Sequence, residues 1–158
     1  MGTGEVFTPG DALRTADILY VATASQARED MRRQLLSLGA GRVQVAESRR
    51  EVLNVLLGTP CNLVITEYKL DDLMNGIGLV RVIRSISHPG SVPVFIIGDL
   101  VAPDVVSAAQ RAGANLFLIK PFSAAKLYER LMWVLNRPSP PTLKGYGTGA
   151  GVSGAFGR

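Results

Sequence analysis

Five short apolar runs, each followed by a segment with helical spacing of apolar residues, constrain the fold of this chain more than any other feature. Strands that alternate with helices are typical of parallel sheets, because a crossover helix returns the chain to the end at which each strand begins. We therefore predict an α/β fold, a doubly wound five-stranded parallel sheet of the (βα)5 type with helices on both faces. The five predicted strands are 18–22, 42–46, 62–67, 92–98 and 116–119.

Helix signals fill the segments between these runs. Ser48 followed three residues later by Glu51 is a capping-box pattern, which predicts a helix start. Gly39 fits the position just past the end of the first helix, and Pro103 fits the first turn of the fourth. The predicted helices cover approximately 25–38, 48–58, 76–86, 104–112 and 123–135.

A single carboxylate, Glu67, stands at the end of the third apolar run. A short apolar run bounded by turn signals indicates a strand that is buried on both faces. The last residue of such a strand emerges at the carboxyl edge of a parallel sheet, where ligands and chemistry are found in open α/β folds. Glu67 is therefore the first candidate for a functional residue.

The length and composition fit one folded domain with short extensions. The chain has 158 residues, of which 47% are hydrophobic, so it can bury a sizeable core. We expect the domain to span residues 17–136, after a flexible N-terminal lead-in at 1–16 in which 11–14 can form a short turn. Residues 137–158 are rich in Pro and Gly and contain no acidic residue, so we predict a disordered tail there.

The N-terminus and the apolar runs also bear on where the protein resides. The N-terminus lacks the apolar segment of a signal peptide, and no run approaches the ~18 apolar residues of a membrane span. The one cysteine, Cys61, excludes an intramolecular disulfide. We expect a cytoplasmic protein that does not bind membranes.

Several short motifs occur at the ends of the predicted strands and helices. Gly76 begins the third helix after a loop, the stretch 110–115 contains an Ala-Gly-Ala turn, and 118–122 reads Leu-Ile-Lys-Pro-Phe. Together with the apolar fourth run, these features resemble the receiver domain of bacterial two-component response regulators, including the chemotaxis regulators. The resemblance covers residues 17–136 and implies the receiver/flavodoxin-like form of the predicted sheet. It also implies a cis peptide bond before Pro121.

The same resemblance identifies departures from the family pattern. Receivers hold Mg²⁺ with two acids after the first strand and one after the third, and the third acid is the Asp that accepts the phosphoryl group. Here Ala22 and Thr23 stand at the acidic pair, and Glu67 stands at the phosphoacceptor position. Mg²⁺ prefers anionic oxygen ligands, so we expect no metal and no other cofactor at this edge.

The positions that respond to the phosphoryl group are altered as well. The family places a Ser or Thr after the fourth strand and an aromatic switch residue on the fifth, and here these are Gly98 and Phe117. The family's Lys remains as Lys120. We therefore expect a degenerate receiver, a pseudo-receiver without enzymatic activity, in which Glu67 pairs with Lys120 and fixes one state. The simpler interpretation is a neutralising ion pair without a signalling role.

These expectations describe a stand-alone, atypical response regulator that acts by phosphorylation-independent protein–protein interaction in signal transduction. The roughly 20 residues after Arg137 are too few for an output domain. We expect its partner to be a histidine kinase, a response regulator or an output protein. The resemblance places the partner face, and a homodimer contact, on the fourth helix, the fifth strand and the fifth helix. The candidate residues of this face are Val105, Phe117, Lys126 and Tyr128.

Two alternatives remain open. A conventional phosphorelay receiver would use unusual ligands for Mg²⁺ and the phosphoryl group, and Mg²⁺-dependent labelling would reveal it. A nucleic-acid-binding adaptor would use two arginine clusters, at 28, 32 and 33 and at 49 and 50, together with the basic tail, and its binding would weaken steeply with salt. The net charge of only +4 is mild, so we do not expect a nucleic-acid partner.

Overall fold

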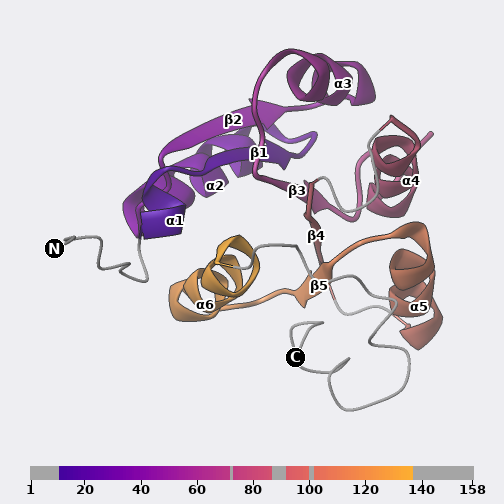
Figure 1. Ribbon diagram of the computed structural model, residues 1–158. Helices are drawn as coiled ribbons and strands as arrows, with labels where there is room; N and C mark the ends of the chain where they lie inside the picture. The colour runs from indigo at the N-terminus through magenta and orange to yellow at the C-terminus, as the bar shows by residue number, and fades with distance from the viewer. Residues whose placement is uncertain (1–10, 72, 87–91, 100–101, 137–158) are drawn as a thin grey trace, which may run out of the picture.

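A sheet of five parallel strands forms the centre of the protein (Figure 1). The computed structural model describes residues 11–71, 73–86, 92–99 and 102–136. The strand order is β2-β1-β3-β4-β5, which confirms the predicted doubly wound α/β fold. The strands are β1 (Asp17–Val21), β2 (Arg42–Ala46), β3 (Leu63–Glu67), β4 (Val94–Gly98) and β5 (Leu116–Ile119).

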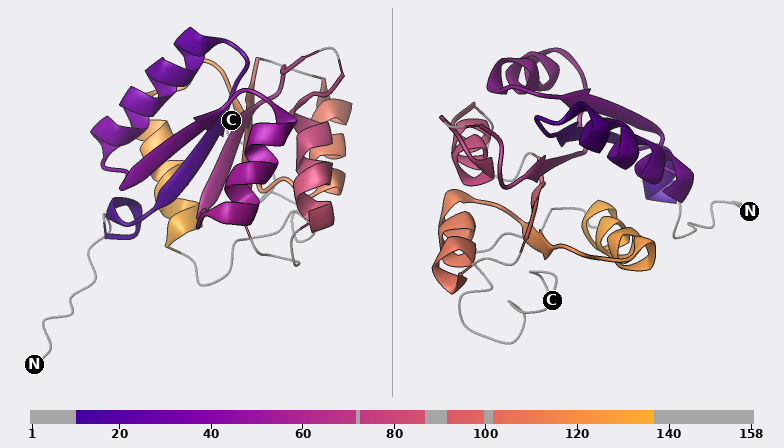
Figure 2. Two further views of the ribbon diagram at one scale, coloured as in Figure 1. Left: turned by 90° about the horizontal axis from the view of Figure 1, so that it is seen from above. Right: turned by 180° about the vertical axis from the view of Figure 1, so that it is seen from behind.

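Helices cover both faces of this sheet. Figure 1 shows α2 and α6 on one face and α3, α4 and α5 on the other, and the two views in Figure 2 show the same layers. In the described part of the chain, no helix combines the length and the apolar character that a membrane crossing requires. The helices are α1 (Asp11–Arg14), α2 (Ser25–Leu38), α3 (Arg49–Gly58), α4 (Gly76–Ile86), α5 (Pro103–Ala112) and α6 (Ala124–Leu135).

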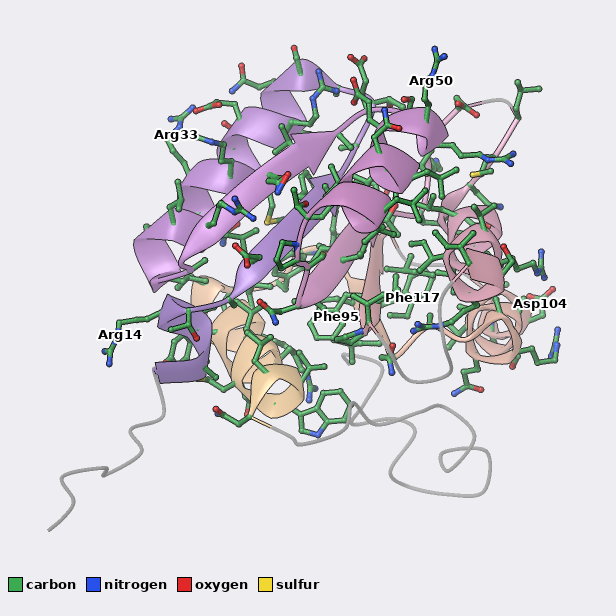
Figure 3. All side chains as sticks on the ribbon, turned by 45° about the horizontal axis from the view of Figure 1, so that its top comes forward. Arg14, Arg33, Arg50, Phe95, Asp104 and Phe117 are labelled. Carbon is green, nitrogen blue, oxygen red and sulfur yellow. The ribbon has the colours of Figure 1, made fainter. Side chains whose placement is uncertain are left out.

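The core is centred on the inner strands of the sheet. β4 is buried along its whole length, and β1 and β3 are buried except for one end residue each. Phe95 and Phe117 are fully buried, and Figure 3 shows them inside the molecule while Arg33, Arg50 and Asp104 point away from it. Burial on both faces explains why these strands are nearly continuous apolar runs in the sequence.

Local sequence signals set the helix ends. Ser48 Oγ accepts a hydrogen bond from the Glu51 backbone N–H at 3.2 Å, and the Glu51 carboxylate accepts one from the Glu47 N–H at 2.7 Å. The second bond reaches one residue before the cap, and together the two bonds satisfy backbone donors ahead of α3, as a capping box does. Gly39 ends α2 with a φ of 112°, a left-handed conformation that glycine adopts without strain.

The folded domain begins earlier than the sequence predicted. α1 places Leu13 in the core with 1% of its surface exposed. Gly41 donates its N–H to Leu13 O at 3.0 Å, and a Cβ on Gly41 would stand 2.3 Å from a backbone oxygen of α1. Residues 11–16 therefore pack as part of the domain and do not form a flexible lead-in. Residues 1–10 and the predicted tail at 137–158 lie outside the described residues.

A half-buried arginine joins α4 to the turn before β5. Arg84 donates hydrogen bonds to Val92 O at 2.6 Å, to Gly113 O at 3.0 and 3.1 Å, and to Asn115 Oδ1 at 2.9 Å. Burial lowers the pKa of the Arg84 guanidinium. The same Asn115 oxygen accepts the Val94 N–H at 2.9 Å, so Arg84 and Asn115 tie α4, β4 and the α5–β5 turn together.

Arg84→Met removes these hydrogen bonds and keeps an unbranched apolar side chain. Because the Gly113 carbonyl loses both of its arginine donors, we expect the free energy of unfolding to fall by about 2–4 kcal/mol. Arg81→Met, at an exposed position on the same helix, is the matched control and should change it by less than about 0.5 kcal/mol. Urea denaturation measures both variants, and equal stabilities would show that the Arg84 contacts contribute nothing net.

Candidate functional site

The carboxyl ends of β3 and β5 bring Glu67 and Lys120 to one edge of the sheet. Glu67 is the last residue of β3, and Lys120 directly follows β5. In the sheet register Glu67 lies opposite Ile97 of β4, which lies opposite Leu118 of β5. Because side chains alternate along a strand, this register places Glu67 and Leu118 on one face, with Lys120 two residues further on. The peptide bond between Lys120 and Pro121 is cis, as the resemblance implied.

The Tyr20 side chain of β1 also contacts Glu67. It lies opposite Ile65, two residues before Glu67, and therefore on the same face of the sheet. Its hydroxyl donates a hydrogen bond to Glu67 Oε2, and Lys120 Nζ donates one to Glu67 Oε1 at 2.6 Å. Tyr20 is 1% exposed, whereas the side chains of Glu67 and Lys120 are 13% and 42% exposed. We call Tyr20, Glu67 and Lys120 the carboxylate cluster, which links β1, β3 and the end of β5.

The carboxylate cluster is electrically balanced. Burial raises the pKa of the Tyr20 phenol, and the hydrogen bond to Glu67 and the negative charge of Glu67 raise that pKa further. Tyr20 therefore stays protonated and remains a hydrogen-bond donor at neutral pH. The carboxylate of Glu67 faces one positive charge, that of Lys120. A carboxylate mostly withdrawn from water needs such partners, because an unpaired buried charge is costly.

The segment after β1 carries no acid. Ala22 is buried and Thr23 is exposed. Arg28 of α2 turns back over this segment and donates to Ala22 O at 2.8 Å and to Thr23 O at 3.0 Å. A guanidinium thus lies against the backbone at the two positions where the family has acids. Among the described residues, no three His, Cys, Asp or Glu side chains gather as a metal site.

Gly98 and Phe117 lie on the opposite face of the sheet from the carboxylate cluster, since each neighbours a residue of that face in its strand. The Phe117 ring lies 5.9 Å from the Tyr68 ring, centroid to centroid, with the planes tilted by 48°. A Cβ built on Gly98 would stand 3.0 Å from Tyr68 Cβ and 3.4 Å from Phe117 Cζ. Tyr68 and Phe117 therefore fill the space in which a Ser or Thr side chain at this position would begin.

The burial of Phe117 corrects the predicted partner face. Phe117 has 0% of its surface exposed, so it is not available as an apolar contact for a partner. β5 is an edge strand, but α5 and α6 cover its two faces (Figure 1), and a side chain on it is buried on either side. Val105, Lys126 and Tyr128 are partly exposed, and their role as a partner face stays a prediction.

The arginines of α2 are engaged by neighbouring groups. Arg32 lies 3.5 Å from Glu29, and Arg33 lies 3.4 Å from Glu29 and 3.6 Å from Asp30. Arg28 is occupied by the two backbone carbonyls described above. Exposed ion pairs of this kind add little stability, but they offset the positive charge that a nucleic-acid site requires.

Comparison with known proteins agrees with this architecture. The family model of the response regulator receiver domain matches residues 18–132. The chain belongs to this family. Among its receiver relatives, chemotaxis protein CheY-3 of Vibrio cholerae serotype O1 is 30% identical over 120 residues, which cover 76% of this chain and 92% of CheY-3. As a receiver, the protein acts in two-component signalling.

Solved receiver structures share its fold. A response regulator receiver domain protein from Clostridium thermocellum matches with a TM-score of 0.69 and 27% identity, over 77% of this chain and 95% of that one. The chemotaxis protein CheY4 of Vibrio cholerae gives a TM-score of 0.70 over 77% of this chain and 99% of CheY4. Its identity is 24%, so that likeness bears on the fold alone.

Sequence reasoning found Glu67 and Lys120 and missed the residues around them. Tyr20 belongs to no motif, yet the hydroxyl of a tyrosine in a buried strand usually finds a hydrogen-bond partner, and this signal pointed to a polar group nearby. Tyr68 and Arg28 gave no comparable signal, because their contacts arise only from the tertiary arrangement.

Tyr20→Phe should change how stability depends on pH. The pKa of Tyr20 in the folded protein lies above its unfolded value of about 10. Its contribution to the free energy of unfolding is therefore complete below about pH 10 and declines as the pH rises further. Above about pH 10, the free energy of unfolding of the wild type should fall by up to about 1.4 kcal/mol per pH unit more than that of Tyr20→Phe. Urea denaturation across this range measures the difference, and parallel curves would contradict a raised pKa.

Gly98→Ala tests whether the two aromatic rings leave room for a side chain. Tyr68 Cβ is attached to the backbone and cannot move aside alone, so we expect a loss of about 1–3 kcal/mol in the free energy of unfolding. Gly58→Ala is the control, because a Cβ at that exposed position meets nothing within 4 Å. Thermal and urea denaturation compare the two, and an alanine tolerated equally at both positions would refute the packing argument.

Proposed function

We propose that this receiver acts by phosphorylation-independent protein–protein interaction in signal transduction, with Glu67 holding one state of the domain. The observation that carries the proposal is the carboxylate cluster, in which both oxygens of Glu67 already have donors. One donor comes from β1 and the other follows β5, so the residue at the phosphoacceptor position is tied to both sides of its strand. In this proposal the site performs no catalysis.

The surroundings of Glu67 favour this proposal over metal-dependent phosphotransfer. Mg²⁺ binds proteins through carboxylates and other oxygens in near-octahedral geometry. Ala22 and Thr23 supply no carboxylate, and the Arg28 guanidinium brings a positive charge to the same segment. Of the three positions at which the family has acids, position 67 alone carries a carboxylate, and a divalent cation would compete for it with Lys120.

Of the two groups that bind phosphoryl oxygens in the family, the lysine is paired with Glu67 and the hydroxyl is absent. Lys120 Nζ is bound to Glu67 at 2.6 Å, and position 98 has no hydroxyl. Glu67 also extends one methylene further than an Asp, and a misplacement of about 1 Å at a reacting atom can cost about a hundredfold in rate. Each difference weakens phosphotransfer, and together they support a domain that does not depend on it.

The cluster and the ring packing together support a fixed conformation. Releasing Lys120 would leave the mostly buried Glu67 carboxylate without its positive partner, which is unfavourable. On the other face, Tyr68 and Gly98 hold Phe117 inside the core. A partner protein, such as a kinase, a response regulator or an output protein, would then read a surface that does not change with phosphorylation.

Exposure to a small-molecule phosphodonor tests the proposal. The full chain is incubated with acetyl phosphate, with and without Mg²⁺, and its intact mass is measured. We expect no phosphorylated species under either condition, while a receiver with a complete acidic set, run in parallel, becomes labelled. Mg²⁺-dependent addition of a phosphoryl group to a carboxylate of this chain would contradict the proposal and favour a conventional phosphorelay receiver.

A further inference from the structure

β2 is the more open of the two edges of the sheet. β2 and β5 are the outer strands, and Figure 1 shows them at opposite ends of the sheet. Phe117 and Leu118 of β5 have 0% of their surface exposed, whereas Val45 of β2 is 37% exposed. We propose that β2 pairs with β2 of a second copy of this chain, antiparallel, about a two-fold axis at Gln44. The proposal goes beyond the function proposed above, because β2 contributes no residue to the carboxylate cluster.

The backbone of β2 has hydrogen-bonding groups on its open side. Arg42 donates its N–H to Ala16 O at 3.0 Å, and in the register of this parallel pair every second residue of β2 binds β1 in the same way. Val43 and Val45 therefore direct their N–H and C=O groups away from the sheet. In the part of the chain that the structure describes, no strand or loop pairs with this side of β2.

The sequence of β2 does not protect this edge. Strands at a sheet edge usually carry lysine, proline or a bulge, each of which prevents another strand from pairing. β2 has none of these. Its one charged residue, Arg42, stands at its start, and the Arg42 guanidinium lies 2.8 Å from the Asp17 carboxylate of the same chain. The β-branched side chains of Val43 and Val45 suit a strand with neighbours on both sides.

The order of residues in β2 favours a second copy of the chain as the partner strand. A two-fold contact requires a surface that is complementary to itself. The stretch 43–45 reads Val-Gln-Val from either end, so an antiparallel copy places valine opposite valine and Gln44 opposite Gln44. Because Val43 and Val45 direct their backbone groups outward, Val43 of one copy and Val45 of the other exchange both of their N–H···O bonds.

An exposed leucine of α2 lies beside the same edge. Arg28 of α2 lies 4.0 Å from Glu47, the residue that directly follows β2, so this side of α2 borders β2. Leu36 comes two steps of four residues after Arg28 and lies on the same ridge of the helix, with 39% of its surface exposed. Pairing would withdraw Leu36 and Val45 from water, which is favourable for apolar surface.

The charges beside the edge allow two copies to meet. Three arginines there have carboxylate partners in their own chain, in the pairs Arg42–Asp17, Arg28–Glu47 and Arg32–Glu29. An antiparallel copy also brings the positive start of β2, at Arg42, towards the negative residue that follows its end, Glu47. In a parallel pair, like charges would meet at both ends, so the charges favour the antiparallel arrangement.

Sedimentation equilibrium of the full chain tests the proposal. We expect a concentration-dependent dimer, and Val45→Lys should raise its Kd at least about tenfold, because it places a lysine in the paired edge. Leu57→Lys is the matched control, because Leu57 is 74% exposed on α3, and it should leave Kd unchanged. A chain that stays monomeric up to about 1 mM would overturn the proposal. So would a dimer that Tyr128→Lys dissociates and Val45→Lys leaves intact, since its contact would lie on the predicted partner face.

A cysteine at the proposed axis tests the register and does not depend on the stability of Val45→Lys. Opposite residues of an antiparallel pair that share no hydrogen bonds have Cα atoms about 4.5 Å apart, within the range that a disulfide spans. Gln44→Cys in a Cys61→Ser background should therefore form a disulfide-linked dimer with oxidised glutathione. Asn54→Cys in the same background, at an exposed position of α3, is the control. Cross-linking of Gln44→Cys that does not exceed that of Asn54→Cys would contradict the pairing.

Discussion

A carboxylate held between two donors organises the functional edge of this receiver. Glu67 ends β3 with 13% of its side chain exposed, and water therefore solvates it poorly. Tyr20 and Lys120 supply the missing hydrogen bonds from β1 and from the end of β5. Removing either donor would leave a charged group unsatisfied, so the cluster fixes the Glu67 side chain and couples three parts of the sheet. At the segment after β1, the Arg28 guanidinium of α2 donates to the carbonyls of Ala22 and Thr23, which adds a second positive charge near this edge.

The period of two along each strand divides the residues of this edge between the two faces of the sheet. Glu67 and its donors face one side, while Tyr68, Gly98 and Phe117 pack together on the other. Lys120 is paired with Glu67 on the first face, and on the second face Tyr68 and Phe117 occupy the space beside Gly98.

The sequence predicted the strands, the sheet class and the capping box of α3, because these depend on local periodicity and on side chains close in sequence. The predictions that were wrong or missing have physical causes. Residues 11–16 read as flexible, yet Leu13 packs in the core beneath Gly41, a contact between distant segments. Phe117 was expected on a surface, but two helices cover its strand. Tyr20 was missed because its role depends on which strand lies beside β3, information that a single strand does not contain.

NMR relaxation dispersion on the full chain tests the central claim, that the Glu67–Lys120 contact holds the domain in one conformation. It detects exchange between states on the microsecond-to-millisecond timescale. The account predicts flat profiles in wild type for backbone amides around Gly98 and Phe117. Glu67→Gln, which keeps the shape but removes the charge that binds Lys120, should introduce exchange at these positions. Exchange of equal size in wild type and Glu67→Gln would contradict the account.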